Sequence, residues 1–107
     1  MEEIVAMKEV MIEMMEMEEM SVKLSGDIDA SNAEAFFGEV MTAYGEGKDL
    51  TFDCAELSFI DSTTLGTFVK IFKKTKADGK KMRIVNLPQK IKKLFVICSL
   101  DTVMEIA

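Results

Sequence analysis

The feature that most constrains the fold is a regular alternation of helix-like and strand-like stretches from residue 20 onward. Three stretches repeat apolar residues three and four positions apart, which places them on one face of a helix. These apolar stripes begin at Ala33, Leu65 and Ile91. Short β-prone runs precede and follow them, at residues 20–25, 50–54, 82–86 and 103–106. Because strands separated by helices need crossover connections, the pattern predicts an α/β fold with a mainly parallel central sheet and helices packed on it.

The first twenty residues are rich in Met and Glu and fit two structures. Both residue types favour helix, but residues 10–17 also alternate, and strand pairing overrides local propensity. We expect residues 10–17 to form an N-terminal antiparallel hairpin with residues 20–25, through a turn at Glu18-Glu19. The predicted order is β-β-α-β-α-β-α-β. The length of 107 residues is that of a single domain, 1–107, in which 1–9 are a flexible or an extra N-terminal segment.

Charge is distributed unevenly along the chain. Residues 1–61 carry 3 Lys and 16 Asp or Glu, a net charge of −13, whereas residues 62–107 carry 10 Lys or Arg and 3 Asp or Glu, a net charge of +7. The total of −6 argues against general nucleic-acid binding. Two interpretations stay open for the asymmetry. Either the charges are solvated helix faces, or they form a bipolar surface that orients a protein partner.

The absence of histidine excludes several kinds of catalytic and metal site. Ser-His and Cys-His nucleophiles and His-ligated metals need a residue that this chain lacks, so we expect no enzymatic activity, no metal and no cofactor. Cys54 and Cys98 lie in apolar contexts and are expected to be buried, reduced thiols. With no signal peptide and no apolar span of the required length, the expected location is the cytoplasm, without membrane insertion.

The most informative local motif runs from Phe59 to Gly66. Asp61-Ser62 follows an apolar strand end and opens a helical stripe, so the Ser62 hydroxyl is expected at a helix N-terminus, where unpaired N–H groups favour an anion. A phosphoserine there adds about −1.5 to −2 charge beside Asp61, which suits a binding switch that leaves the fold intact. The alternative is that Asp61 or Ser62 is an ordinary helix cap.

The motif and its neighbours together resemble the STAS domain family, in particular its free-standing bacterial anti-sigma-factor antagonists. The resemblance rests on five stretches in the expected order: Leu24–Asp29, Leu50–Asp53, Leu57–Ser62, Lys80–Asn86 and Ile91–Phe95. It covers residues 10–106. In most members Asp-Ser is followed by Ser-Gly-Leu, whereas this chain has Thr63, Thr64 and Leu65, with Thr64 in the position of the usual Gly.

The resemblance implies a partner-switching regulator of transcription. Its partners are expected to be an anti-sigma factor that is also a serine kinase, and a metal-dependent serine phosphatase. Ser62 matches the phosphoacceptor, with Thr63 and Thr64 as second candidates. The implied partner-binding surface consists of Asp29, Asp61, Ser62, Thr63, Thr64 and Gly66. The alternative is a non-switching STAS scaffold or adaptor of a signalling assembly or transporter. We expect a monomer.

Overall fold

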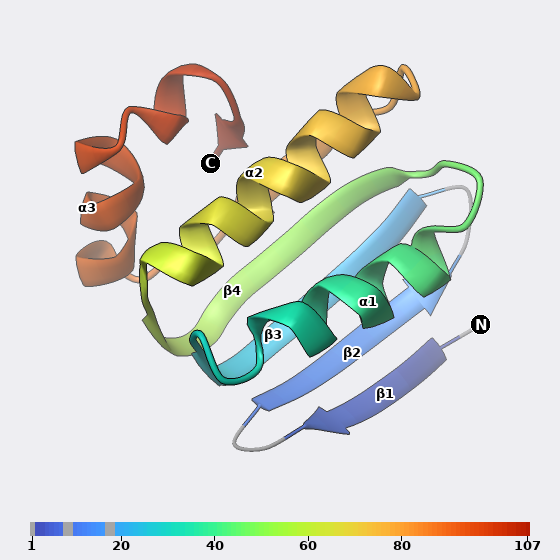
Figure 1. The fold of residues 1–107 in the computed structure, drawn as a ribbon, viewed down its shortest axis with the longest axis horizontal. Coiled ribbons are helices and arrows are strands. Elements are labelled where there is room, and N and C mark those ends of the chain that lie inside the picture. Colours follow the sequence, from blue (N-terminus) through green and yellow to red (C-terminus); the bar gives the residue numbers. More distant parts are fainter. Residues whose placement is uncertain (1, 8–9, 17–18) are drawn as a thin grey trace.

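The computed structural model describes residues 2–7, 10–16 and 19–107, and it is an α/β fold (Figure 1). The elements follow one another as β1 (Glu2–Met7), β2 (Val10–Glu16), β3 (Glu19–Ile28), α1 (Ala33–Tyr44), β4 (Asp49–Ile60), α2 (Ser62–Ala77), β5 (Met82–Val85), α3 (Gln89–Ile97), the short 3-10 helix η1 (Leu100–Thr102) and β6 (Glu105–Ile106). None of the described helices is both long and apolar enough to cross a membrane.

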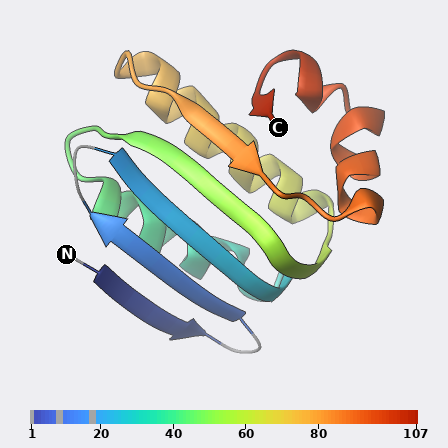
Figure 2. The same cartoon turned by 180° about the vertical axis from the view of Figure 1, so that it is seen from behind.

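The six strands form one sheet, in which their spatial order is the same as their order along the chain, β1-β2-β3-β4-β5-β6 (Figure 2). β1, β2 and β3 pair antiparallel, whereas β3, β4, β5 and β6 are mutually parallel. Each parallel connection contains a helix, as the crossover rule requires.

The predicted element order is wrong at its start, because β1 precedes the two strands that the sequence indicated. Residues 2–7, expected to be a flexible or an extra segment, form an edge strand of the sheet. The run Ile4-Val5-Ala6 is too short to separate a strand from the Met- and Glu-rich background by periodicity. Residues 17–18, which include part of the expected turn, lie outside the described residues.

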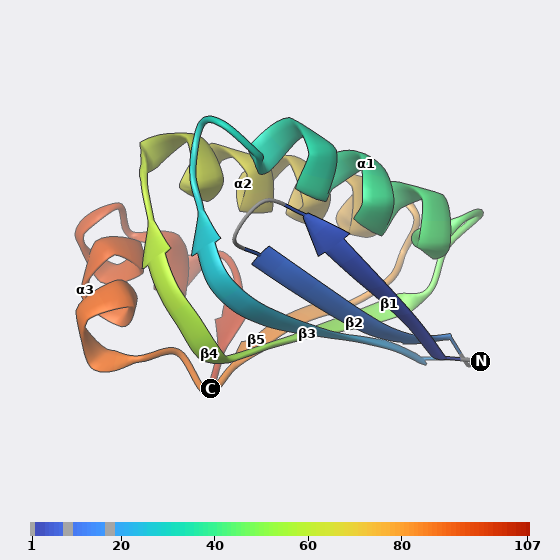
Figure 3. The same ribbon diagram turned by 90° about the horizontal axis from the view of Figure 1, so that it is seen from below.

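Both α1 and α2 cover the same face of the sheet (Figure 3). Alternate residues of the parallel strands point toward these helices and are almost inaccessible to solvent, for example Val22, Phe52 and Ile84. The intervening positions on the other face are polar, such as Lys23 and Arg83, which are exposed. The sheet therefore buries one face and leaves the other face in water, in the described part of β3 to β5.

A cluster of four phenylalanines holds the layers together. Phe36 of α1, Phe52 of β4, Phe68 of α2 and Phe95 of α3 are all fully buried. Their rings meet at centroid distances of 5.3–6.1 Å, mostly edge to face, with Phe68 in contact with the other three. Such pairs add to the burial energy of large apolar side chains. Phe68 of α2 thus connects α1, α3 and the sheet at the centre of the core.

The two cysteines differ in their surroundings. Cys54 is buried, and this burial, with a smaller effect from Asp53, raises the pKa of its thiol to about 12. Cys98 is exposed, so its predicted burial is wrong. It caps the C-terminus of α3, a nine-residue helix that buries only Ile91 and Phe95.

Candidate functional site

The candidate site lies where β3 and β4 end side by side. The two strands are in register at their last residues, Ile28 and Ile60. From there the chain enters α1 through residues 29–32 and enters α2 directly after Asp61. Because the carboxyl ends of parallel strands meet at one edge, the Asp29 loop and the start of α2 are brought together, as the sequence motif requires (Figure 1).

Asp61 is the N-cap of α2. Its Oδ1 accepts a hydrogen bond from the Thr64 backbone N–H at 3.0 Å, and its Oδ2 accepts one from the Ala30 backbone N–H at 2.9 Å. The same carboxylate therefore caps the helix and holds the loop that precedes α1. Between the two cap candidates, the structure selects Asp61 and not Ser62.

The hydrogen bonds also determine the charge of Asp61. Burial raises the pKa of its carboxyl group, but the N–H donors of Thr64 and Ala30 outweigh the burial, so this pKa lies below the ordinary value for aspartate. Asp61 is therefore ionised at neutral pH. Because the pKa is lowered in the folded state, ionised Asp61 stabilises the fold, and this contribution is lost as the pH falls through the folded-state pKa.

Thr64 is completely buried, which argues against its predicted place on the partner-binding surface and against its role as a second phosphoacceptor. Its hydroxyl donates to the Ile28 carbonyl and accepts from the Asp61 backbone N–H at 3.4 Å. The hydroxyl also lies 3.1 Å from Asp61 Oδ1. Thr64 completes a capping box with Asp61 and ties the first turn of α2 to the end of β3. The motif alone did not indicate this inward orientation.

We expect Thr64→Val to lower the free energy of unfolding by about 1–3 kcal/mol, because it removes the hydroxyl from a buried site while keeping the shape of the side chain. Thr64→Ser is the matched control. It keeps the hydroxyl and loses one methyl group, so a decrease of about 1 kcal/mol is expected. Urea unfolding followed by far-UV circular dichroism measures both values. A Thr64→Val protein as stable as the wild type would show that the buried hydrogen bonds contribute nothing.

Ser62 is the first residue of α2, and its side chain is exposed. Among the described residues, the Ser62 hydroxyl makes no hydrogen bond, since the capping interactions belong to Asp61. Thr63, the next residue, is exposed as well, and Gly66 is exposed one turn further along. An exposed hydroxyl without a structural partner is available for modification.

The amides at this helix terminus are already partly occupied. Asp61 accepts a hydrogen bond from the backbone N–H group of Thr64 at 3.0 Å. The expectation that unpaired first-turn amides favour an anion at Ser62 therefore has to be revised, because one of these donors already serves the Asp61 carboxylate. A phosphate on Ser62 would stand beside a negative charge and face the solvent.

The Asp29 loop is fixed by side-chain hydrogen bonds of its own. Asp29 Oδ1 accepts from the backbone N–H of Ser31 at 2.9 Å and from the Ser31 hydroxyl. Asn32 accepts from the Asp29 N–H at 2.9 Å and donates to the Asp27 carbonyl at 2.9 Å. Asn32 is the N-cap residue of α1. These contacts hold Asp29 in a defined position next to Asp61.

Phe59 is a neighbour that the sequence pattern did not single out. Its side chain is 51% exposed, although it precedes the buried Ile60. It lines a shallow hollow of about 200 Å³ together with Leu94, which is 37% exposed, and Lys90 of α3. Strand alternation was the available signal, since consecutive residues of a strand point to opposite faces. We call Asp29, Phe59, Asp61, Ser62, Thr63 and Gly66 the Ser62 face.

Comparison with known proteins places this geometry in a family context. A model of the STAS domain matches residues 6–107 of the chain. The anti-sigma-B factor antagonist of Bacillus subtilis (strain 168) is 30% identical over 89 residues, which are 83% of this chain and 82% of that protein. The match therefore extends over most of both chains.

Two solved structures of SpoIIAA share the fold. The unphosphorylated anti-sigma factor antagonist SpoIIAA has a TM-score of 0.76 at 22% identity, covering 90% of this chain and 87% of its own. The phosphorylated form of the Bacillus cell fate determinant SpoIIAA has a TM-score of 0.67 at 19% identity, covering 100% and 91%. At these identities the likeness shows a common architecture of parallel strands and helices.

Proposed function

The chain belongs to the STAS domain family, and on that premise we propose that it is an anti-sigma factor antagonist that changes partners according to the phosphorylation of Ser62. The relative with 30% identity is an anti-sigma-B factor antagonist. SpoIIAA, with the same fold, has been described in unphosphorylated and phosphorylated forms. The observation that carries the proposal is the Ser62 hydroxyl, which is exposed at the first residue of α2 and makes no hydrogen bond with the described residues.

In the unphosphorylated state, the Ser62 face binds an anti-sigma factor and so releases a sigma factor for transcription in the cytoplasm. Phe59 supplies an exposed aromatic ring of the kind that anchors protein interfaces, and the hollow beside it admits an apolar side chain. The hydrogen bonds of Asp61 and Asn32 hold the two loops in place before binding, so little conformational freedom is lost on docking.

Phosphorylation reverses this interaction through charge. The anti-sigma factor acts as a serine kinase and transfers the γ-phosphoryl group of ATP to Ser62 Oγ, while the serine proton leaves to a base of the kinase and ADP is released. The phosphoserine then carries about −1.5 to −2 charge next to the ionised Asp61. Docking of the anti-sigma factor would remove this charge from water without placing an opposite charge beside it, which is unfavourable. A metal-dependent serine phosphatase hydrolyses the phosphoserine with water, which restores the hydroxyl and releases inorganic phosphate.

The catalytic groups of this cycle belong to the partners, and this chain is their substrate and ligand. A non-switching scaffold would give Ser62 only a structural role. The capping interactions are made by Asp61 and Thr64, so the exposed Ser62 hydroxyl has no structural role that a scaffold would need. The structure therefore favours the switch.

Incubation with the cognate kinase and ATP is expected to add one phosphate, which tryptic mass spectrometry should locate on Ser62. Ser62→Ala should accept none, and Thr63→Val, in which the neighbouring exposed hydroxyl is removed, should still accept one. Phosphate on another residue, or an equal amount on Ser62→Ala, would contradict the assignment of Ser62.

A further inference from the structure

The sheet converts the charge asymmetry of the sequence into two opposite edges. Because the strands lie in the sheet in chain order, residues of the acidic half occupy the β1 side and residues of the basic half occupy the β5–β6 side (Figure 2). The two halves carry net charges of −13 and +7. One edge of the sheet therefore lies in the acidic half of the chain and the other edge in the basic half. A strand order that mixed the two halves would have placed both signs of charge at each edge.

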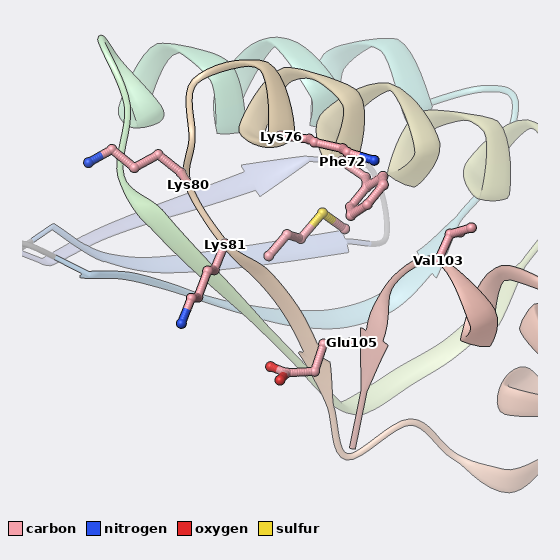
Figure 4. A pocket seen from close by; sticks show the side chains of 7 residues that line it. Phe72, Lys76, Lys80, Lys81, Val103 and Glu105 are labelled. Carbon is pink, nitrogen blue, oxygen red and sulfur yellow. The ribbon is translucent and has the colours of Figure 1, made fainter.

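The basic edge contains a hollow of about 380 Å³ between α2, β5 and β6 (Figure 4). Phe72, Met82 and Val103 supply its apolar surface, and Val103 is 56% exposed. Lysines and one carboxylate line the rest: Lys76, Lys80, Lys81 and Glu105.

Among the described residues, one carboxylate lines this hollow, and it is already paired. Glu105 forms a 2.6 Å salt bridge with Arg83. No ion pair engages Lys76, Lys80 or Lys81 among the described residues, whereas the nearby Lys74 is paired with Asp78 at 3.3 Å. The hollow therefore combines exposed apolar surface with three positive charges, and its chemistry fits an acidic, partly apolar segment of protein.

At the other edge, β1 offers such a segment. β1 pairs with β2 on one side and ends the sheet on the other, so its outer backbone groups have no strand partner in the described residues. Its sequence places Glu2 and Glu3 directly before Ile4 and Val5. Free edges of this kind are templates for another strand unless charged side chains, proline or a bulge protect them. β1 contains no proline, and its only charged residues are Glu2 and Glu3.

We infer that copies of this chain associate head to tail, with the β1 edge of one copy docked at the β5–β6 edge of the next. Pairing of two identical edges is disfavoured, because acidic would meet acidic or basic would meet basic. A head-to-tail contact places opposite charges together. It leaves one free edge at each end of an open assembly, so it produces filaments, or rings where the two ends meet. This inference replaces the expected monomer and goes beyond the proposed function.

Salt and geometry are both compatible with such a contact. The molecule extends 32 Å along its longest axis, whereas charges are screened beyond about 10 Å at 0.1 M salt. The attraction between the oppositely charged facing edges therefore exceeds the repulsion between two chains of net charge −6. The Ser62 face lies at the carboxyl ends of β3 and β4, in the middle of the strand order, and remains accessible in the assembly.

Sedimentation equilibrium of the full chain tests the contact. At about 0.1 M NaCl the average mass of the wild type should rise with protein concentration, and the association constant should fall at least tenfold at about 1 M NaCl, where the screening length is about 3 Å. Lys80→Glu/Lys81→Glu and Glu2→Lys/Glu3→Lys should each be monomeric. A mixture of these two variants should associate again, because each retains the edge that the other has lost.

The control is Lys92→Glu/Lys93→Glu on α3, which makes the same change in net charge outside the hollow and should associate like the wild type. Circular dichroism melts verify that each variant is folded. The inference is overturned if the wild type stays monomeric up to about 1 mM, if the two variants fail to associate when mixed, or if the α3 control dissociates as completely as Lys80→Glu/Lys81→Glu.

Discussion

Ser62→Asp is expected to weaken binding of the cognate anti-sigma factor by roughly 100-fold or more, because an unpaired charge in a docked interface costs about 2–5 kcal/mol. The fold should tolerate the change. Ser62 is exposed and outside the hydrogen-bond network of the cap, and a negative charge in the first turn of a helix is favourable by about 0.3–1 kcal/mol. Isothermal titration calorimetry gives the affinity, and a thermal melt gives the stability.

Two controls separate charge from other effects in this experiment. Ser62→Ala removes the hydroxyl without adding charge and should bind like the wild type. Ser21→Asp makes the same substitution at an exposed position of β3, away from the Ser62 face, and should also leave binding unchanged. Equal affinities of Ser62→Asp and wild type would remove the physical basis of the proposed switch.

Phe68→Ala is expected to have the largest effect on stability, with a loss of about 3–5 kcal/mol in the free energy of unfolding. Phe68 is fully buried and is the residue whose ring meets those of Phe36, Phe52 and Phe95. The deletion therefore leaves a cavity between α1, α2, α3 and the sheet. Since a domain of this size has a total stability of roughly 5–15 kcal/mol, this loss removes a large fraction of it.

Phe59→Ala is the matched control, because the same atoms are removed from a side chain that is 51% exposed. Its stability should change by about 1 kcal/mol or less, whereas its affinity for the anti-sigma factor should fall. Urea unfolding of both variants measures the difference. Similar losses of stability for Phe68→Ala and Phe59→Ala would mean that the aromatic cluster is not the centre of the core.

Most of what was correctly predicted about the fold came from the apolar stripes of the three helices. The apolar spacing from Ala33, Leu65 and Ile91 placed α1, α2 and α3, because burial of one helix face leaves a direct record in the sequence. β1 left no such record, since a short apolar run among helix-forming residues is stabilised by pairing with β2, which is a non-local interaction.

The position of the site and its exposed hydroxyl could be predicted from the sequence, but the orientations of the neighbouring side chains could not. The order Asp61-Ser62 before an apolar stripe located the helix start and the exposed hydroxyl. The inward turn of Thr64 depends on the Ile28 carbonyl of another strand, 36 residues away along the chain, and no local pattern reveals such a contact. The exposure of Phe59 could be predicted only with the knowledge of which face of the strand is covered by α1 and α2.

The most direct test of the account is the phosphate occupancy of Ser62 in the cell of origin. Tagged chain is captured with its bound partner, separated from unbound chain, and both pools are analysed by intact mass and by peptide mapping. The account predicts that chain bound to the anti-sigma factor is unmodified at Ser62, and that phosphoserine at position 62 occurs in the unbound pool. Equal phosphate occupancy of Ser62 in the bound and unbound pools would contradict it.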